Sequence, residues 1–156
     1  MLHNYKGQPA KPEKPNRQVM QVQECMTKNV QLNTFQPEQR MVDVIKTLVK
    51  KRISGGPVID DTGNLVGMIS EGDCLREVVR GKYNNSLHLT GKVKDYMVTN
   101  VTTLQYDTDI LDAAQKFLTM RLRRFPVMKD GKIIGQVSQQ DVMKALLEQD
   151  EVTTTK

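Results

Sequence analysis

The chain lacks tryptophan and contains three phenylalanines among 156 residues, so its core is expected to be aliphatic. No apolar run approaches the length of a membrane-spanning helix. The first residues, MLHNYKGQPAKPEKPNRQ, also lack the apolar stretch of a secretory signal. We therefore expect a soluble, cytoplasmic protein. Its 38% hydrophobic residues suffice for one compact domain or two small ones that share an interface.

Cysteine and histidine are also scarce. Cys25 and Cys74 form no CxxC pair, and His3 and His88 stand at no metal-ligand spacing from them. This pattern excludes a standard structural zinc site, and we expect no bound metal. Neither histidine accompanies a nucleophile in a catalytic pattern, so the sequence does not predict an enzyme. Both cysteines are expected to be small core residues in a reducing compartment.

The net charge of +5 is modest, and most of it lies in residues 1–17. Four basic residues stand against one acidic residue there, which leaves +3 in this segment and +2 in the remainder. Three prolines favour an extended, solvated tail. Because nucleic-acid binding requires a basic face on a folded domain, the composition does not favour it.

The chain contains an internal repeat, which is found by aligning Pro57 with Pro126. Apolar residues recur at helical spacing over 41–49 and again over 110–118. After each proline, a strand, a turn and a second strand follow: PVID, DTGN, LVGMIS and PVMK, DG, KIIGQVS. A helical pattern closes each copy. We therefore predict an α+β protein made of two β-α-β-β-α units.

These observations divide the chain into five segments. They are an extended basic tail (1–17), a first repeat (18–80), a polar linker (81–92), a second repeat (93–149) and a disordered end (150–156). A unit of about sixty residues is marginal alone. We expect the two repeats to pack on each other.

Several local motifs have an ordinary structural explanation. Asp60 and Asp61 are adjacent and lack the spacing of a calcium loop, so a hairpin turn is favoured. No GK[ST] follows Gly55-Gly56, which excludes a P-loop. These glycines either permit close packing or let a ligand approach the backbone, and the sequence does not separate the two.

The spacing Gly-x-x-Ser-x-x-Asp occurs in both copies, with Ser70 and Asp73 in the first and Ser138 and Asp141 in the second. A serine followed by an acid three residues later is close to a capping box. The same carboxylate, at a helix N-terminus, could accept hydrogen bonds from a vicinal diol, and the free N–H groups there could meet an anion. Likewise, the Arg123-Arg124 pair is either solvated or suited to bind phosphate.

Taken together, SGGPVID…GNLVGMISEGD and RRFPVMKDGKIIGQVSQQD resemble a tandem pair of CBS domains, the cystathionine-beta-synthase repeat. The resemblance covers about residues 19–149. It implies two repeats packed sheet-to-sheet with pseudo-twofold symmetry, and often a homodimer of such pairs. It also implies a regulatory module that binds an adenosine nucleotide (AMP, ADP or ATP), or S-adenosylmethionine or NAD. A partner protein, which the sequence does not identify, would read the bound state.

The resemblance places two ligand clefts between the repeats. The favoured cleft would be formed by Thr27, Asn29, Val30, Ile53, Ser54, Gly55, Arg123, Arg124, Ser138 and Asp141. The second cleft would be formed by Ser70, Asp73, Val98, Asn100, Val101, Leu122 and Arg123. The first is favoured because the bulky LRRF segment narrows the second, where ISGG stands in the first. The competing hypothesis is a dimerising interaction module with degenerate clefts.

Overall fold

The computed structural model describes residues 18–28, 31–83 and 89–154. The predicted tail, residues 84–88 of the predicted linker and both histidines lie outside the described residues. The elements are α1 (Val22–Cys25), β1 (Thr27–Lys28), α2 (Met41–Lys51), β2 (Gly55–Ile59), β3 (Leu65–Ser70), α3 (Glu71–Tyr83), α4 (Val93–Tyr96), β4 (Leu104–Gln105), α5 (Ile110–Met120), β5 (Arg124–Lys129), β6 (Lys132–Ser138) and α6 (Gln139–Thr154).

The predicted α+β repeat is confirmed by this order of elements. A helix, a β-hairpin and a second helix occur twice, as α2-β2-β3-α3 and α5-β5-β6-α6. Helices α2 and α5 end in the same way, because Arg52 and Arg121 both adopt left-handed backbone angles with φ of 53°. A left-handed residue is a common helix terminator. The duplication in sequence is therefore a duplication in backbone conformation.

The two hairpin turns have the chemistry that the sequence predicts. Asp130 and Gly131 both have positive φ, 50° and 75°, as a two-residue hairpin turn of the favoured hand requires. In the other hairpin, Asp60 accepts hydrogen bonds from the backbone N–H groups of Thr62 and Asn64, both at 2.9 Å. These bonds hold the pKa of Asp60 below its usual value. The carboxylate of Asp60 therefore stabilises the hairpin turn, as the sequence predicts.

The two halves exchange their first segments. Strand β1, from the first repeat, pairs with β6 of the second in a four-stranded sheet ordered β1-β6-β5-β4. Reciprocally, Val98 of the second repeat bridges Met68 of the first. Each first segment also begins with a single helical turn, α1 or α4, where the sequence predicted only a strand. Short turns of this kind bury one residue and leave no periodic pattern to detect.

Two hydrophobic cores follow from this exchange. Val22 of α1 is buried in the core formed by α5, α6 and the second hairpin, whereas Val93 of α4 is buried in the core of α2, α3 and the first hairpin. Both cores are largely aliphatic, as predicted, although each also buries phenylalanine. Each hydrophobic core therefore contains residues from both sequence repeats.

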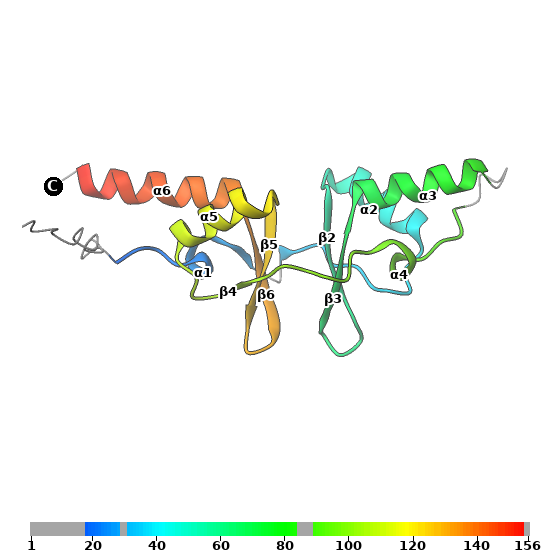
Figure 1. Ribbon diagram of the computed structural model, residues 1–156, viewed down its shortest axis with the longest axis horizontal. Coiled ribbons are helices and arrows are strands. Elements are labelled where there is room, and N and C mark those ends of the chain that lie inside the picture. The colour runs from blue at the N-terminus through cyan, green and yellow to red at the C-terminus, as the bar shows by residue number, and fades with distance from the viewer. Residues whose placement is uncertain (1–17, 29–30, 84–88, 155–156) are drawn as a thin grey trace, which may run out of the picture.

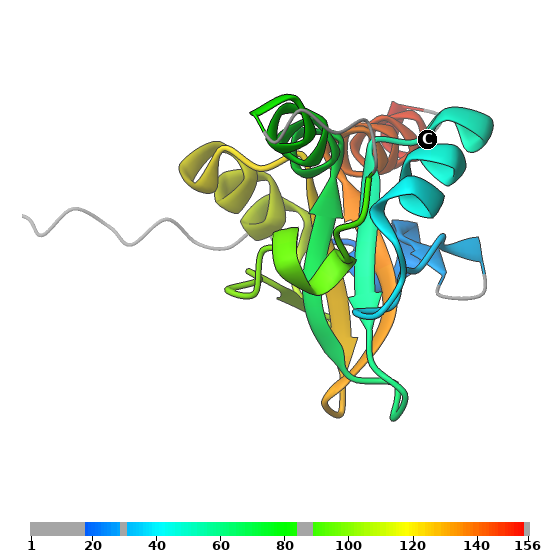
Figure 2. The same cartoon turned by 90° about the vertical axis from the view of Figure 1, so that its right-hand side faces the viewer.

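The hairpins β2-β3 and β5-β6 lie side by side at the centre of the molecule, with the long helices on one side of them (Figure 1). Turned by 90°, the molecule shows the helices at one end and the hairpin tips at the other (Figure 2). At the tips, Lys132 donates to the carbonyl of Thr62 and to Asn64 Oδ1, each at 3.1 Å. Helix α6 continues to Thr154, so the disordered end predicted from residue 150 is wrong for residues 150–154.

Candidate functional site

A cleft of about 240 Å³ lies between the two repeats. Its walls come from segments far apart in sequence, because Thr27 and Ile53 belong to the first repeat and Ser138 and Asp141 to the second. The exchange of β1 onto β6 places Thr27 opposite Gln136 and so builds one wall. The lining residues are Thr27, Gln31, Leu32, Asn33, Ile53, Gly55, Gly56, Pro57, Arg124, Gln136, Ser138 and Asp141.

The carboxylate of Asp141 is only partly engaged at the start of α6. The backbone N–H of Ser138 donates to Asp141 Oδ2 at 2.9 Å, and the backbone N–H of Asp141 donates to Ser138 Oγ at 3.1 Å. These reciprocal bonds form the predicted capping box. No donor among the described residues reaches Asp141 Oδ1. As far as the described residues go, this second oxygen is available as a hydrogen-bond acceptor.

A second cavity of about 370 Å³ adjoins this cleft. The two cavities share Arg124 and Ser138 as lining residues. Arg123 contributes to the outer cavity alone, and neither arginine pairs with a carboxylate of the described residues. An unpaired guanidinium beside a helix N-terminus is a favourable environment for an anion. The outer cavity is also lined by Ser54, Gln139, Gln140 and Met143.

The two glycines at the start of β2 are explained by packing as well as by the cleft. A Cβ on Gly55 would lie 2.2 Å from the carbonyl oxygen of Ile69, and one on Gly56 would lie 2.5 Å from that of Asn33. Backbone therefore passes too close for any side chain here. Because both glycines also line the cleft, the two interpretations of the sequence hold together.

The residues predicted for the second cleft have different surroundings. Asp73 is 2% exposed, and its carboxylate accepts from the N–H and hydroxyl of Ser70, at 2.8 and 3.1 Å, and from Arg76. Val98 and Asn100 are exposed, Val101 is half-buried, and Leu122 directs its carbonyl to Gln139 Nε2 at 3.0 Å. The structure thus brings Ser70 and Asp73 together but leaves neither carboxylate oxygen of Asp73 free.

Six of the residues predicted for the favoured cleft line the inner cavity: Thr27, Ile53, Gly55, Arg124, Ser138 and Asp141. Asn29 and Val30 lie outside the described residues. Ser54 and Arg123 line the outer cavity and not the inner one. The sequence analysis missed Asn33, Pro57 and Gln136, among others. Gln136 could have been found, because alternation along β6 places it on the same face of the strand as Ser138.

Cys25, in α1, is half-buried near this cleft. Burial, and then the negative charge of Asp141, raise the pKa of Cys25 to about 11. Burial likewise raises the pKa of Cys74. Both thiols are therefore protonated at neutral pH, which agrees with the structural role expected for them.

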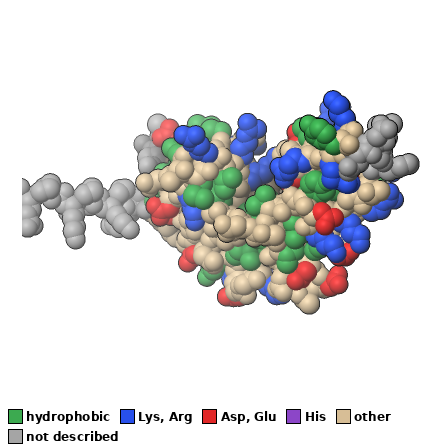
Figure 3. All heavy atoms as spheres, turned by 45° about the vertical axis from the view of Figure 1, so that its right-hand side comes forward, with side chains coloured by type: hydrophobic (Ala, Val, Ile, Leu, Met, Phe, Trp, Pro, Cys, Tyr) green, Lys and Arg blue, Asp and Glu red, His purple; other side chains and the backbone are tan. Residues whose placement is uncertain are grey.

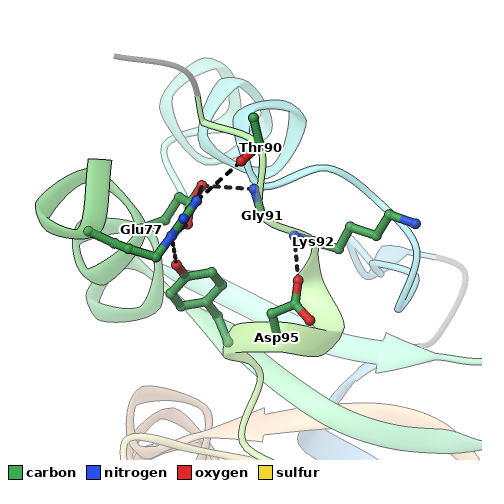
Figure 4. A network of polar contacts seen from close by, with 7 residues as sticks. Glu77, Thr90, Gly91, Lys92 and Asp95 are labelled. Atoms are coloured by element: carbon green, nitrogen blue, oxygen red, sulfur yellow. Dashed lines mark hydrogen bonds and ion pairs between the residues drawn. The ribbon is translucent and has the colours of Figure 1, made fainter. Parts of the chain in front are cut away.

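A separate polar network surrounds Glu77 of α3 (Figure 4). Glu77 is fully buried and accepts two hydrogen bonds from Arg80 at 2.9 Å and one from the backbone N–H of Gly91 at 2.8 Å. Hydrogen bonds from Arg80, above all, lower the pKa of Glu77 to about 2. Arg80 also donates to the hydroxyl of Tyr96 at 2.7 Å. The network fastens α3 to the segment that leads into α4.

On the face seen in Figure 3, basic side chains are scattered among apolar and acidic ones and form no continuous stripe. No helix among the described residues is long and apolar enough to span a membrane. Within the same residues, no group of three or more histidine, cysteine or acidic side chains could hold a metal ion.

Comparison with known proteins agrees with the geometry. The family model of the CBS domain matches residues 22–80 and 93–148. The chloroplastic CBS domain-containing protein CBSX2 of Arabidopsis thaliana is 30% identical over 81% of this chain and 63% of its own length. An uncharacterised protein of Methanocaldococcus jannaschii is 28% identical over 85% of this chain and 94% of its own.

Solved structures give the same result. CBSX2, solved in complex with AMP, superposes with a TM-score of 0.73 at 32% identity, covering 83% of this chain and 98% of that one. A CBS domain pair solved with 5′-methylthioadenosine and S-adenosyl-L-methionine reaches a TM-score of 0.69 at 22% identity, covering 84% and 98%. The second likeness concerns the fold alone.

Proposed function

The chain belongs to the CBS-domain family, and from this premise we propose that it is a regulatory module that binds an adenosine nucleotide in the cleft closed by Asp141. The class of ligand is supported by CBSX2, which was solved with AMP. AMP, ADP and ATP are the favoured ligands, and S-adenosylmethionine and NAD are the others to test. No cofactor is required by this proposal.

The observation that carries the proposal is the free oxygen of Asp141 beside a basic cavity. Asp141 Oδ1 has no donor among the described residues and can accept from a ribose hydroxyl. Arg124 lines both the inner and the outer cavity and is available to an anionic group of the same ligand. A ligand that carries both a diol and an anionic group matches these two features.

Binding between the repeats would transmit a signal because both repeats supply the walls. A ligand that contacts both halves stabilises the arrangement in which they close on it. A partner protein that recognises that arrangement would then respond to the nucleotide concentration, as in energy sensing. We place this activity in the cytoplasm, and the partner is an effector protein to be identified.

We further propose a homodimer through α3 and α6. The exposed apolar residues of these helices occupy matching positions of the two repeats: Leu75 and Met143, 64% and 58% exposed, and Val79 and Leu147, 50% and 65% exposed. Because the surface repeats with the pseudo-twofold symmetry of the fold, a second copy presents a complementary face. Size-exclusion chromatography with light scattering tests this, and Leu147→Glu should favour the monomer.

A thermal-shift panel of AMP, ADP, ATP, NAD and S-adenosylmethionine tests nucleotide binding directly. A ligand at about 100 times its Kd adds ~2.7 kcal/mol of stability, which raises the melting temperature by several degrees. If none of the five raises it, the sensing function fails. The competing function, a dimerising interaction module with degenerate clefts, is then favoured by the exposed apolar helices.

A further inference from the structure

The helices that end the two repeats, α3 and α6, carry matching apolar residues but opposite charges. Their exposed apolar positions coincide, as described above for the proposed dimer. Their charges do not, because Arg80 of α3 corresponds to Glu148 of α6, and Lys82 corresponds to Asp150. All four of these residues are exposed. The C-terminal part of α3 is therefore basic where the C-terminal part of α6 is acidic.

The same difference holds for the four long helices as pairs. Helices α2 and α3 of the first repeat contain six basic and four acidic residues, which gives a net charge of +2. Helices α5 and α6 of the second repeat contain two basic and five acidic residues, which gives a net charge of −3. The backbone of the helical layer thus repeats, while the sign of its charge changes from one repeat to the other.

The direction of α3 and α6 decides which charges a second copy would meet. Both helices begin beside the central hairpins and run outward to opposite ends of the molecule (Figure 1). A second copy packed on the helical layer by a twofold axis therefore places outer ends on outer ends. Each repeat then faces either its own counterpart or the other repeat of the second copy. The first orientation brings like charges together, which is unfavourable, and the second pairs basic α3 with acidic α6.

The shape of the two repeats favours the same orientation. A groove of about 460 Å³ is lined by α2, α3 and residues next to them, and six of its eight lining residues are apolar. One of them, Val49, corresponds in the second repeat to the longer Leu118, which is 79% exposed. If each repeat faced its own counterpart, groove would oppose groove. If the first repeat faces the second, the exposed leucine of one copy is available to fill the groove of the other.

We propose that a second copy of this chain docks on the helical layer in the antiparallel orientation, so that the first repeat of each copy contacts the second repeat of the other. This inference rests on the homodimer proposed above and adds its orientation. Each end of the dimer then combines α2 and α3 of one copy with α5 and α6 of its partner. Charges of opposite sign surround the apolar contacts at both ends.

Spin labels on the full chain test the orientation directly by pulsed electron resonance. Tyr83→Cys places a label on an 85% exposed residue at the end of α3, and Glu148→Cys places one on α6. We expect a long distance between labels when both copies carry Tyr83→Cys, because the two labels lie at opposite ends of the dimer. A mixture of the two variants should add a short distance. Wild type treated with the same reagent gives the background from Cys25 and Cys74.

The possible outcomes separate the orientation from the homodimer itself. A short distance within the Tyr83→Cys dimer, with no short distance added in the mixture, overturns the antiparallel orientation while the homodimer stands. If light scattering shows a monomer and no distance between copies is measured, the homodimer fails and the orientation with it. Nucleotide binding is judged independently of both by the thermal-shift panel.

Reversal of charge provides a second test. Lys82→Glu and Glu148→Lys should each raise the dissociation constant of the dimer about fivefold at low salt, because each replaces attraction by repulsion. The double variant should return to within about twofold of the wild type, since the charges are exchanged and still opposite. Lys82 is chosen because Arg80 already bonds to Glu77. Single variants that dimerise like the wild type, or a double variant weaker than either, would overturn the proposal.

Discussion

Arg76 donates a hydrogen bond to Asp73, the buried acid of the first repeat. The matching residue of the second repeat is Lys144, which is exposed and makes no ion pair with Asp141 within the described residues. Both carboxylate oxygens of Asp73 therefore accept hydrogen bonds, whereas only one oxygen of Asp141 does so within the described residues. The pseudo-twofold symmetry of the backbone does not extend to the chemistry of its two clefts.

We expect AMP to bind with a stoichiometry of one per chain. Asp73→Asn should leave both the stoichiometry and the affinity unchanged, since Asp73 is committed to Ser70 and Arg76. It should nevertheless lower the free energy of unfolding by ~1–3 kcal/mol, because a buried charge partner is lost. Isothermal titration measures the first quantity and urea denaturation the second. Two AMP molecules per chain in the wild type would contradict this account.

Asp141→Asn should raise the Kd for AMP at least about tenfold, because a hydrogen bond to a charged acceptor is lost. The free protein should remain nearly as stable, since the neighbouring cap of Ser138 is kept and the charge effect on the helix is ~0.3–1 kcal/mol. The matched ligand is 2′-deoxyadenosine 5′-monophosphate. It should bind the wild type more weakly than AMP, whereas the variant should no longer distinguish the two. A variant that still distinguishes them would place the diol elsewhere.

Much of this arrangement could be predicted from local sequence patterns. Helical periodicity located α2 and α5, and Asp130-Gly131 located a hairpin turn, because both depend on neighbours in sequence. The pairing of β1 with β6 could not be found in this way, since two strand residues meet a partner more than a hundred positions away. The same applies to Arg76, whose role depends on which neighbouring atoms already have hydrogen-bond partners.

Arg124→Met should weaken AMP about tenfold or more while changing the affinity for adenosine less than about twofold. The reason is that Arg124 lines both cavities and pairs with no acidic side chain of the described residues, so it is available to make charge-assisted bonds to phosphate. Arg121→Gln is the control, because Arg121 is a nearby exposed cation at the end of α5. Titration at two salt concentrations measures the effect. Equal weakening of adenosine and AMP would show that Arg124 acts on the shape of the cleft.

The buried Glu77 should make stability depend on pH in a defined window. Its pKa is about 2 in the folded protein and near 4.5 when unfolded, so its contribution is fully present above pH 4.5 and is lost as the pH falls toward 2. Glu77→Gln should therefore cost ~2 kcal/mol at pH 7, where the charge-assisted bonds to Arg80 are intact. The difference between wild type and variant should shrink below pH 4.5.

Glu38→Gln is the control for this experiment, because Glu38 shares the lowered pKa of Glu77 but not its burial. Hydrogen bonds from Lys92 and then Lys94 also lower the pKa of Glu38 to about 2, yet its side chain is 63% exposed. Exposed ion pairs are screened by solvent and contribute little, so this variant should unfold like the wild type at pH 7. Urea denaturation from pH 2 to pH 7 measures all three proteins. Two outcomes would contradict the role of the buried network in holding α3 to α4. Glu38→Gln could lower the free energy of unfolding as much as Glu77→Gln does. Alternatively, the plot of unfolding free energy against pH for Glu77→Gln could run parallel to that of the wild type.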